Sequence, residues 1–141
     1  MLATELAVDL AIMFTAMYAM VASSRHALFN VNNIYMTLVM VAPMAMLMLF
    51  TMRHMFQNKK LNFVLYALLA AVMLSSIYGI RTQALVGDQQ FLRSMIPHHS
   101  GAILMCEEAK ISDPEIIRLC REIIASQSRE IAQMEAILQR H

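Results

Sequence analysis

Two long apolar segments without a charged residue limit what this chain can fold into. They cover residues 34–52 and 61–80. As α-helices, which rise about 1.5 Å per residue, they would span about 28–30 Å, close to the hydrocarbon core of a bilayer. Segment 6–23 is also apolar, but it contains Asp9 and follows Glu5. We therefore predict three transmembrane helices, with the lipid bilayer as a partner.

Composition agrees with a small membrane protein that carries an aqueous domain. Of the 141 residues, 59% are hydrophobic and only 15% are charged, which differs clearly from an average soluble domain. Few charges precede residue 81 and most follow it. We predict a transmembrane region at 1–82 and a separate domain at 88–141. The net charge of +1 argues against nucleic acid as a partner.

Basic residues in the short connections predict the orientation in the membrane. The connection between the second and third apolar segments holds Arg53, Lys59 and Lys60, whereas the first connection holds Arg25. Because cytoplasmic loops are enriched in Lys and Arg, the second connection and the N-terminus are predicted to be cytoplasmic. The expected location is the cell (inner) membrane, with several spans and the C-terminal domain on the periplasmic or extracellular side.

Fifteen methionines form the most unusual part of the composition. In the second apolar segment they recur every fourth residue and form a slowly spiralling stripe: Met36, Met40, Met44, Met48 and Met52. One interpretation is that methionine fills gaps between packed helices. The other is a thioether track for a soft ion such as Cu(I) or Ag(I). Spacing alone leaves both open.

The C-terminal domain reads as two amphipathic helices joined by a short turn. The first begins at 88 and contains Pro97, and Asp113 with Pro114 is a helix-start signal for the second. The predicted inward face of the first helix consists of Asp88, Phe91, Met95, Ala102, Cys106 and Ala109, and His98 and His99 straddle it. That of the second consists of Ile116, Cys120, Ile123, Gln127, Ile131, Met134 and Leu138. A turn this short makes the helices antiparallel neighbours.

An antiparallel hairpin sets a register in which the numbers of facing residues sum to about 225. The facing pairs are Ala109 with Ile116, Cys106 with Cys120, Ala102 with Ile123, His98 or His99 with Gln127, Met95 with Glu130 or Ile131, and Phe91 with Met134. Apolar residues thus oppose apolar residues along both helices. Four polar groups, which are His98, His99, Gln127 and Glu130, fall at one level.

The two cysteines oppose each other in this register. Packed helices bring inward Cα atoms to about the separation that a disulfide needs, and an oxidising compartment would favour the bond between Cys106 and Cys120. The alternatives are two buried thiols that pack as small apolar residues, or two thiolate metal ligands.

The hairpin resembles a known family. The matching residues are Phe91, Met95 to His99, Ala102, Met105, Asp113 to Glu115, Gln127, Glu130, Ile131 and Met134. They resemble the domain of unknown function numbered three-zero-five. The upstream part is similar to a membrane-bound subgroup with three spans and a methionine-rich second helix. The resemblance implies an all-α, ferritin-like helical bundle and, in some members, binding of periplasmic copper or silver.

The chain differs from longer members of that family in having one helical hairpin rather than a repeated unit. Two amphipathic helices are marginal alone in water. The hairpin is therefore expected to rest on the membrane part or to form half of a four-helix bundle that a homo-oligomer completes.

These observations favour a membrane-anchored, extracytoplasmic metal-binding protein for copper or silver handling or tolerance. The expected ligands are imidazole and thioether groups, which suit these ions: Met95, His98, His99, Met105 and Met134. Gln127 and Glu130 would orient the imidazoles. Other metal-handling membrane proteins are candidate partners.

Two other interpretations remain open at this stage. The histidines could simply satisfy backbone groups freed beside Pro97, and the hairpins could assemble an oligomeric membrane complex without metal. An enzyme is not expected, because the chain has no nucleophile elbow, phosphate loop or zinc-protease motif.

Overall fold

The computed structural model describes residues 2–53, 55 and 57–140, and the predicted domain ends at 1 and 141 lie outside them. It has no strand in this part of the chain, so the all-α prediction is confirmed. The elements are α1 (Leu2–Ala16), η1 (Met17–Met20), η2 (Ser24–His26), α2 (Val31–Thr51), α3 (Lys59–Thr82), α4 (Asp88–Glu108) and α5 (Pro114–Leu138), where η marks a short 3-10 helix.

The chain divides into two compact units. The first consists of Met1–Met17 and Asn32–Leu85, and the second of Tyr18–Val31 and Val86–His141. Residues 18–31, between α1 and α2, therefore belong with the C-terminal hairpin. One boundary between the units falls between Leu85 and Val86, and the inclusion of residues 18–31 in the second unit was not predicted from sequence.

Two helices of the first unit are long and apolar enough to cross a membrane. They are α2 with 21 residues and α3 with 24. The expected third span is not among them, because α1 has only 15 residues. At about 1.5 Å per residue it covers about 22 Å, less than a hydrocarbon core of about 30 Å. The prediction of three spans is thus corrected to two candidate spans in the described chain.

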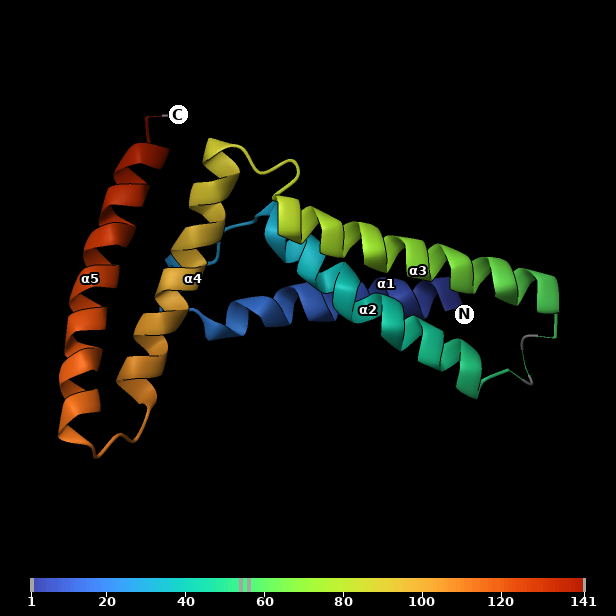
Figure 1. Cartoon of the computed structure of the whole chain (residues 1–141), viewed down its shortest axis with the longest axis horizontal. Coiled ribbons are helices and arrows are strands. Elements are labelled where there is room, and N and C mark those ends of the chain that lie inside the picture. Colours follow the sequence, from blue (N-terminus) through green and yellow to red (C-terminus); the bar gives the residue numbers. More distant parts are fainter. Residues whose placement is uncertain (1, 54, 56, 141) are drawn as a thin grey trace. The chain divides into compact units, whose positions relative to one another are not determined.

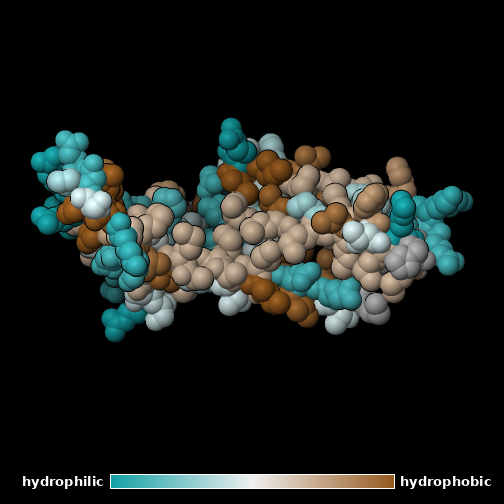
Figure 2. Space-filling view, turned by 90° about the horizontal axis from the view of Figure 1, so that it is seen from below, coloured by the Kyte–Doolittle hydropathy of each residue, from teal (hydrophilic) through white to brown (hydrophobic). Residues whose placement is uncertain are grey.

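Contacts between α2 and α3 explain one glycine. A Cβ atom on Gly79 would lie 2.8 Å from the ring of Tyr35, so a larger residue there would force the ring to shift. The Tyr35 hydroxyl donates to the carbonyl of Ala84 at 2.8 Å, and Tyr66 donates to the carbonyl of Met46 at 3.2 Å. Large apolar side chains nonetheless stay exposed on these helices, for example Phe63 at 75% and Tyr78 at 68%. Apolar side chains also cover much of the surface seen in Figure 2.

In the second unit, α4 and α5 run side by side in opposite directions (Figure 1). Asp113 caps α5 through its side chain, which accepts from the backbone N–H groups of Glu115 and Ile116, and Pro114 opens the helix. Both features are as predicted. Helix α4 continues through Pro97. Its N-cap is Gly87, and Asp88 is the first residue inside the helix.

The buried face of α4 is rotated from the predicted one. The buried residues are Leu92, Ile96, His99, Ser100, Gly101 and Ile103, whereas Phe91, expected inside, is 51% exposed. Ile96 and Ile103 form a core with Ile131 of α5, against which Leu28 packs. The difference arises because α4 is covered on two sides, by α5 and by residues 18–31.

Residues 18–31 are fastened to α4 by hydrogen bonds. The N–H of Ala22 donates to the hydroxyl of Ser100 at 2.8 Å, and the N–H of Val31 donates to the side-chain carbonyl of Gln90 at 3.0 Å. A Cβ atom on Gly101 would lie 3.1 Å from the carbonyl oxygen of Met20, so glycine permits this close approach. Residues 18–31 therefore form a third layer, which packs against α4 of the hairpin.

Candidate functional site

His99 is the buried imidazole of the hairpin, with 8% of its surface exposed. Its Nδ1 lies 2.9 Å from the carbonyl oxygen of Met95, and its Nε2 lies 2.8 Å from Oε2 of Glu130. A carbonyl oxygen can only accept, so Nδ1 carries a proton. Oε2 of Glu130 is the partner of the other ring nitrogen, Nε2. Both ring nitrogens of His99 are therefore engaged by protein oxygens, and neither is free to bind a metal ion.

Glu130 is held in its ionised form by two donors. The hydroxyl of Ser126 donates to Oε1 at 2.8 Å, and His99 donates to Oε2. These hydrogen bonds, with that from Ser126 the larger effect, lower the pKa of the Glu130 carboxyl below its usual range. The pair therefore joins α4 to α5 through a charge-assisted contact.

This lowered pKa predicts a pH dependence of hairpin stability. Because the folded pKa of Glu130 lies below the unfolded one, its contribution is complete above the usual carboxyl range of about 4–4.5. It is lost as the pH falls from there through the lower folded value. Thermal unfolding measured from pH 7 to pH 3 should show this loss. Glu130→Gln should weaken the acid dependence, whereas the same change at the exposed Glu122 should leave it intact.

His98 differs from its neighbour in both position and surroundings. It is exposed, whereas His99 is buried. The two rings meet edge to face, with centroids 5.9 Å apart and planes at 66°. One imidazole thus faces the core and the other faces solvent.

The remaining predicted ligands are distributed unevenly. Met95 is half-buried one turn before His98, and Met105 is 56% exposed two turns after it. Met134 packs against the core of Ile96, Ile103 and Ile131. Gln127, expected to orient an imidazole, is half-buried, and Glu130 holds His99. The closest candidate ligands along one helix are therefore Met95 and His98, since residues three apart are neighbours on a helix surface.

The described residues contain no group of three or more His, Cys, Asp or Glu side chains that could hold a metal ion. A site in one chain would therefore depend on thioether sulfur. In the methionine stripe of α2, Met36, Met40 and Met44 are 40%, 40% and 43% exposed, and Met48 and Met52 are half-buried. Met36, Met40 and Met44 are therefore not part of the buried core of this unit.

Cys106 and Cys120 form a disulfide bond that joins α4 to α5, with their Cα atoms 5.3 Å apart. Of the three arrangements considered for these cysteines, the structure has the covalent one. The bond lies near the turn of the hairpin, and the contact between His99 and Glu130 lies farther along the same two helices.

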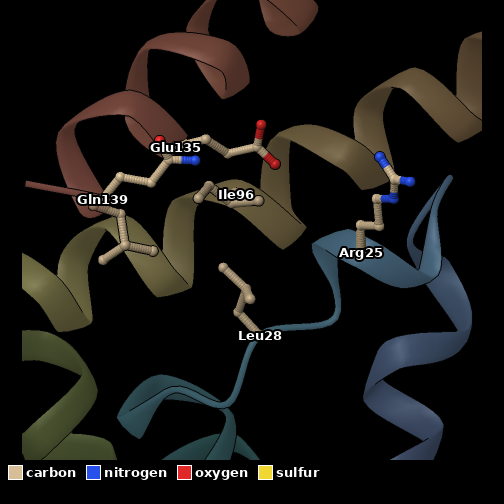
Figure 3. A pocket seen from close by; sticks show the side chains of 6 residues that line it. Arg25, Leu28, Ile96, Glu135 and Gln139 are labelled. Carbon is tan, nitrogen blue, oxygen red and sulfur yellow. The ribbon is translucent and has the colours of Figure 1, made fainter.

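A second polar cluster was not anticipated from sequence. His26 Nδ1 lies 2.8 Å from the hydroxyl of the fully buried Ser100, and His26 Nε2 lies 3.9 Å from Oε1 of Glu135. Arg25 and Glu135 border an open pocket of about 380 Å³, shown in Figure 3 with Ile96 and Leu28. Because Ser100 is buried, we interpret this cluster as a fastening of residues 18–31. The adjacent small residues Ser100 and Gly101 were the available sequence signal.

Comparison with known proteins assigns the chain to a family. The model of the "Domain of unknown function (DUF305)" family matches residues 69–138. An uncharacterized protein of Acanthamoeba polyphaga mimivirus is 36% identical over 111 residues, which cover 77% of this chain and 71% of that protein. The chain belongs to the DUF305 family. No solved structure matches it.

The DUF305 match covers α4 and α5 completely and begins inside α3. It therefore includes His98, the His99–Glu130 contact and both cysteines. Residues 18–31, with His26, lie outside it. Neither the family description nor the name of the viral relative states an activity.

Proposed function

We propose that this protein is a membrane-anchored, extracytoplasmic binder of copper or silver ions, in which Met95 and His98 of paired hairpins supply the ligands. The observation that carries the proposal is the contrast between the two histidines. His99 is buried with both nitrogens engaged, whereas the adjacent His98 is exposed one turn from a thioether. Imidazole nitrogen and thioether sulfur together suit Cu(I) and Ag(I).

The proposed site uses fewer ligands than the set predicted from sequence, because Met105 and Met134 are not included. Met105 lies seven residues from His98, which is about 10.5 Å along a helix, so the two would not readily share one ion. Met134 is occupied in the core. Met95 and His98 provide two donors, and the same pair from a second copy would raise the number to four.

An exposed apolar surface on the hairpin supports pairing with a second copy. Its members are Phe91 at 51%, Met105 at 56%, Ile116 at 47% and Leu119 at 53%. His98 and Ser100 differ by about 200° around α4. Because Ser100 contacts residues 18–31, His98 faces away from that segment. Phe91 lies seven residues before His98, and Met105 lies seven residues after it. All three therefore lie on nearly the same side of α4.

Leu119→Glu is expected to weaken self-association at least about tenfold, because it places a charge within the proposed apolar contact. Crosslinking and light scattering of the detergent-solubilised protein would measure this. Arg118→Glu is the matched control on the neighbouring exposed position and should leave association unchanged. A wild-type protein that is monomeric at all accessible concentrations would refute pairing.

The membrane placement is part of the same proposal. Residues 18–31 and the hairpin contact each other, so they must lie on one side of any membrane. Crossings by both α2 and α3 satisfy this, because two crossings return the chain to the same side. Arg53, Lys59 and Lys60 then lie on the opposite, cytoplasmic side.

A Cu(I) titration of the purified, disulfide-bonded protein tests the proposal. Loss of a direct ligand should cost more than the about 10–100-fold that loss of a ligand's supporting partner typically costs, so His98→Ala should weaken binding by at least that factor. Glu107→Ala, an exposed change on the same helix, should have no effect. Binding that His98→Ala leaves unaltered would refute the assignment.

The second candidate is an assembly protein that pairs through the same surface without metal. The exposed apolar residues of the hairpin favour it, since they need a partner whether or not an ion is bound. Self-association that persists in a protein with no measurable Cu(I) or Ag(I) affinity would select this function. Metal-handling membrane proteins remain proposed partners only under the first function.

A further inference from the structure

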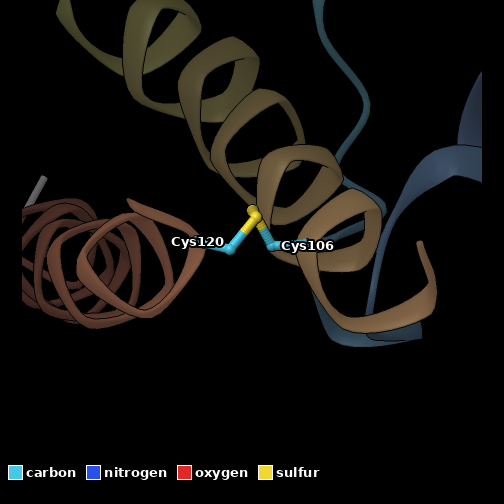
Figure 4. The surroundings of a disulfide bond; sticks show 2 residues. All are labelled: Cys106 and Cys120. Atoms are coloured by element: carbon cyan, nitrogen blue, oxygen red, sulfur yellow. A yellow bond between two sulfur atoms is a disulfide. The ribbon is translucent and has the colours of Figure 1, made fainter. Parts of the chain in front are cut away.

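The disulfide lies at an accessible position. Both cysteines are half-buried rather than enclosed, and the bond bridges the two helices in Figure 4. An open pocket of about 160 Å³ borders both residues. Its other lining side chains are apolar except for Arg121. A small thiol or a metal ion can therefore reach the sulfur atoms, with one positive charge beside them.

The pairing of the two cysteines does not depend on the S–S bond alone. The Asp113 cap begins α5 at a fixed point after the turn, and the contact between His99 and Glu130 fixes the register farther along the hairpin. The core of Ile96, Ile103 and Ile131 links the same helices. After reduction, the two thiols are therefore expected to stay opposite each other, with Cα atoms near the present 5.3 Å.

We propose that Cys106 and Cys120, once reduced, form a two-thiolate site for Cu(I) or Ag(I), so that the redox state of this pair controls a second soft-ion site. This inference extends the function proposed above, because it concerns the same class of ion. It does not use the ligands Met95 and His98.

The redox step is a thiol–disulfide exchange with a small external thiol. Two molecules of this thiol are oxidised to one external disulfide, the bond between Cys106 and Cys120 breaks, and each cysteine gains a proton. The monovalent ion then forms two metal–sulfur bonds and displaces both protons. The resulting centre has one net negative charge, which the guanidinium of Arg121 partly offsets.

The ligand number favours a monovalent soft ion over zinc. Structural zinc sites use four ligands, and the described residues hold no cluster of three or more His, Cys, Asp or Glu. Cu(I) and Ag(I) accept two thiolates, which are the soft ligands that they prefer.

The test compares oxidised and reduced forms of the full-length protein in detergent. The protein is reduced with a phosphine, freed of it without oxygen, and titrated with Cu(I) against a chromogenic chelator. The reduced form should bind about one more ion per chain than the oxidised form, as expected for one two-thiolate site. His98→Ala should keep this gain, and Cys106→Ser/Cys120→Ser should lose it. Equal binding by the two redox forms, or a gain that survives the double serine change, would overturn the inference.

A second measurement guards against a serine variant that folds poorly. Bound Cu(I) should slow alkylation of both thiols in the reduced wild-type protein by about tenfold or more, since alkylation requires a free thiolate. Unchanged alkylation of either cysteine would contradict the proposal. The two proposed sites are tested separately. Binding by the oxidised protein tests only the site of Met95 and His98, and the additional binding after reduction tests the site of Cys106 and Cys120.

Discussion

Ile96→Ala is expected to lower the free energy of unfolding of the hairpin by about 2–5 kcal/mol, the usual cost of truncating a fully buried isoleucine. Ile96 is 0% exposed and packs with Ile103 and Ile131. It also lies beneath Leu28, so it joins three separate parts of the chain. Thermal or denaturant unfolding of the purified protein, followed by circular dichroism, would measure the loss.

The matched control is Ile96→Val, which removes one methyl group and should cost only about 0.5–1.5 kcal/mol. The two changes alter the same contacts to different extents, so their order is the informative result. If Ile96→Ala cost no more than the valine change, Ile96 would not be at the centre of the core.

Loss of the disulfide is expected to have the next largest effect. Cys106 and Cys120 are 14 residues apart, and a bridge closing a loop of about that length contributes about 3 kcal/mol by restricting the unfolded chain. Cys106→Ala/Cys120→Ala should therefore unfold at a clearly lower temperature than the oxidised wild-type protein. The reduced wild-type protein should unfold near the double variant.

The double variant also supplies the control for the reductant. Adding a phosphine should shift the unfolding of the wild-type protein and leave that of the double variant unchanged. An equal shift in both would show that the reductant acts elsewhere, and no shift in either would show that the bond contributes little to stability.

The hairpin could be predicted from sequence because its signals are local. Asp113 and Pro114 mark the start of α5, and the spacing of apolar residues sets which positions of α4 and α5 meet. The facing of Cys106 and Cys120 follows from these two facts alone. The same register places His99 and Glu130 at one level of the hairpin. It does not show which of the two histidines faces inward.

The role of residues 18–31 could not be predicted, because it depends on contacts between distant parts of the chain. The bond from Ala22 to Ser100 joins residues 78 positions apart. Without that layer, a helical wheel centres the buried face of α4 on Phe91 and Met95 rather than on Ile96. The same omission hid the contact of His26 with Ser100.

The length of the first helix could not be predicted for a different reason. Residues 6–23 are almost all apolar, but the α-helix ends at Ala16 and a 3-10 helix follows it. The end of a helix depends on what the chain contacts next. Here those contacts are the ones that residues 18–31 make with α4.

In the proposed function, His98 and a methionine thioether bind a soft ion, whereas His99 stabilises the hairpin. X-ray absorption spectroscopy of the oxidised, Cu(I)-loaded protein tests it most directly, because it identifies the donor atoms. We expect imidazole nitrogen together with sulfur, and loss of the nitrogen signal in His98→Ala. A copper site with sulfur donors alone, or one that His98→Ala leaves unchanged, would contradict it.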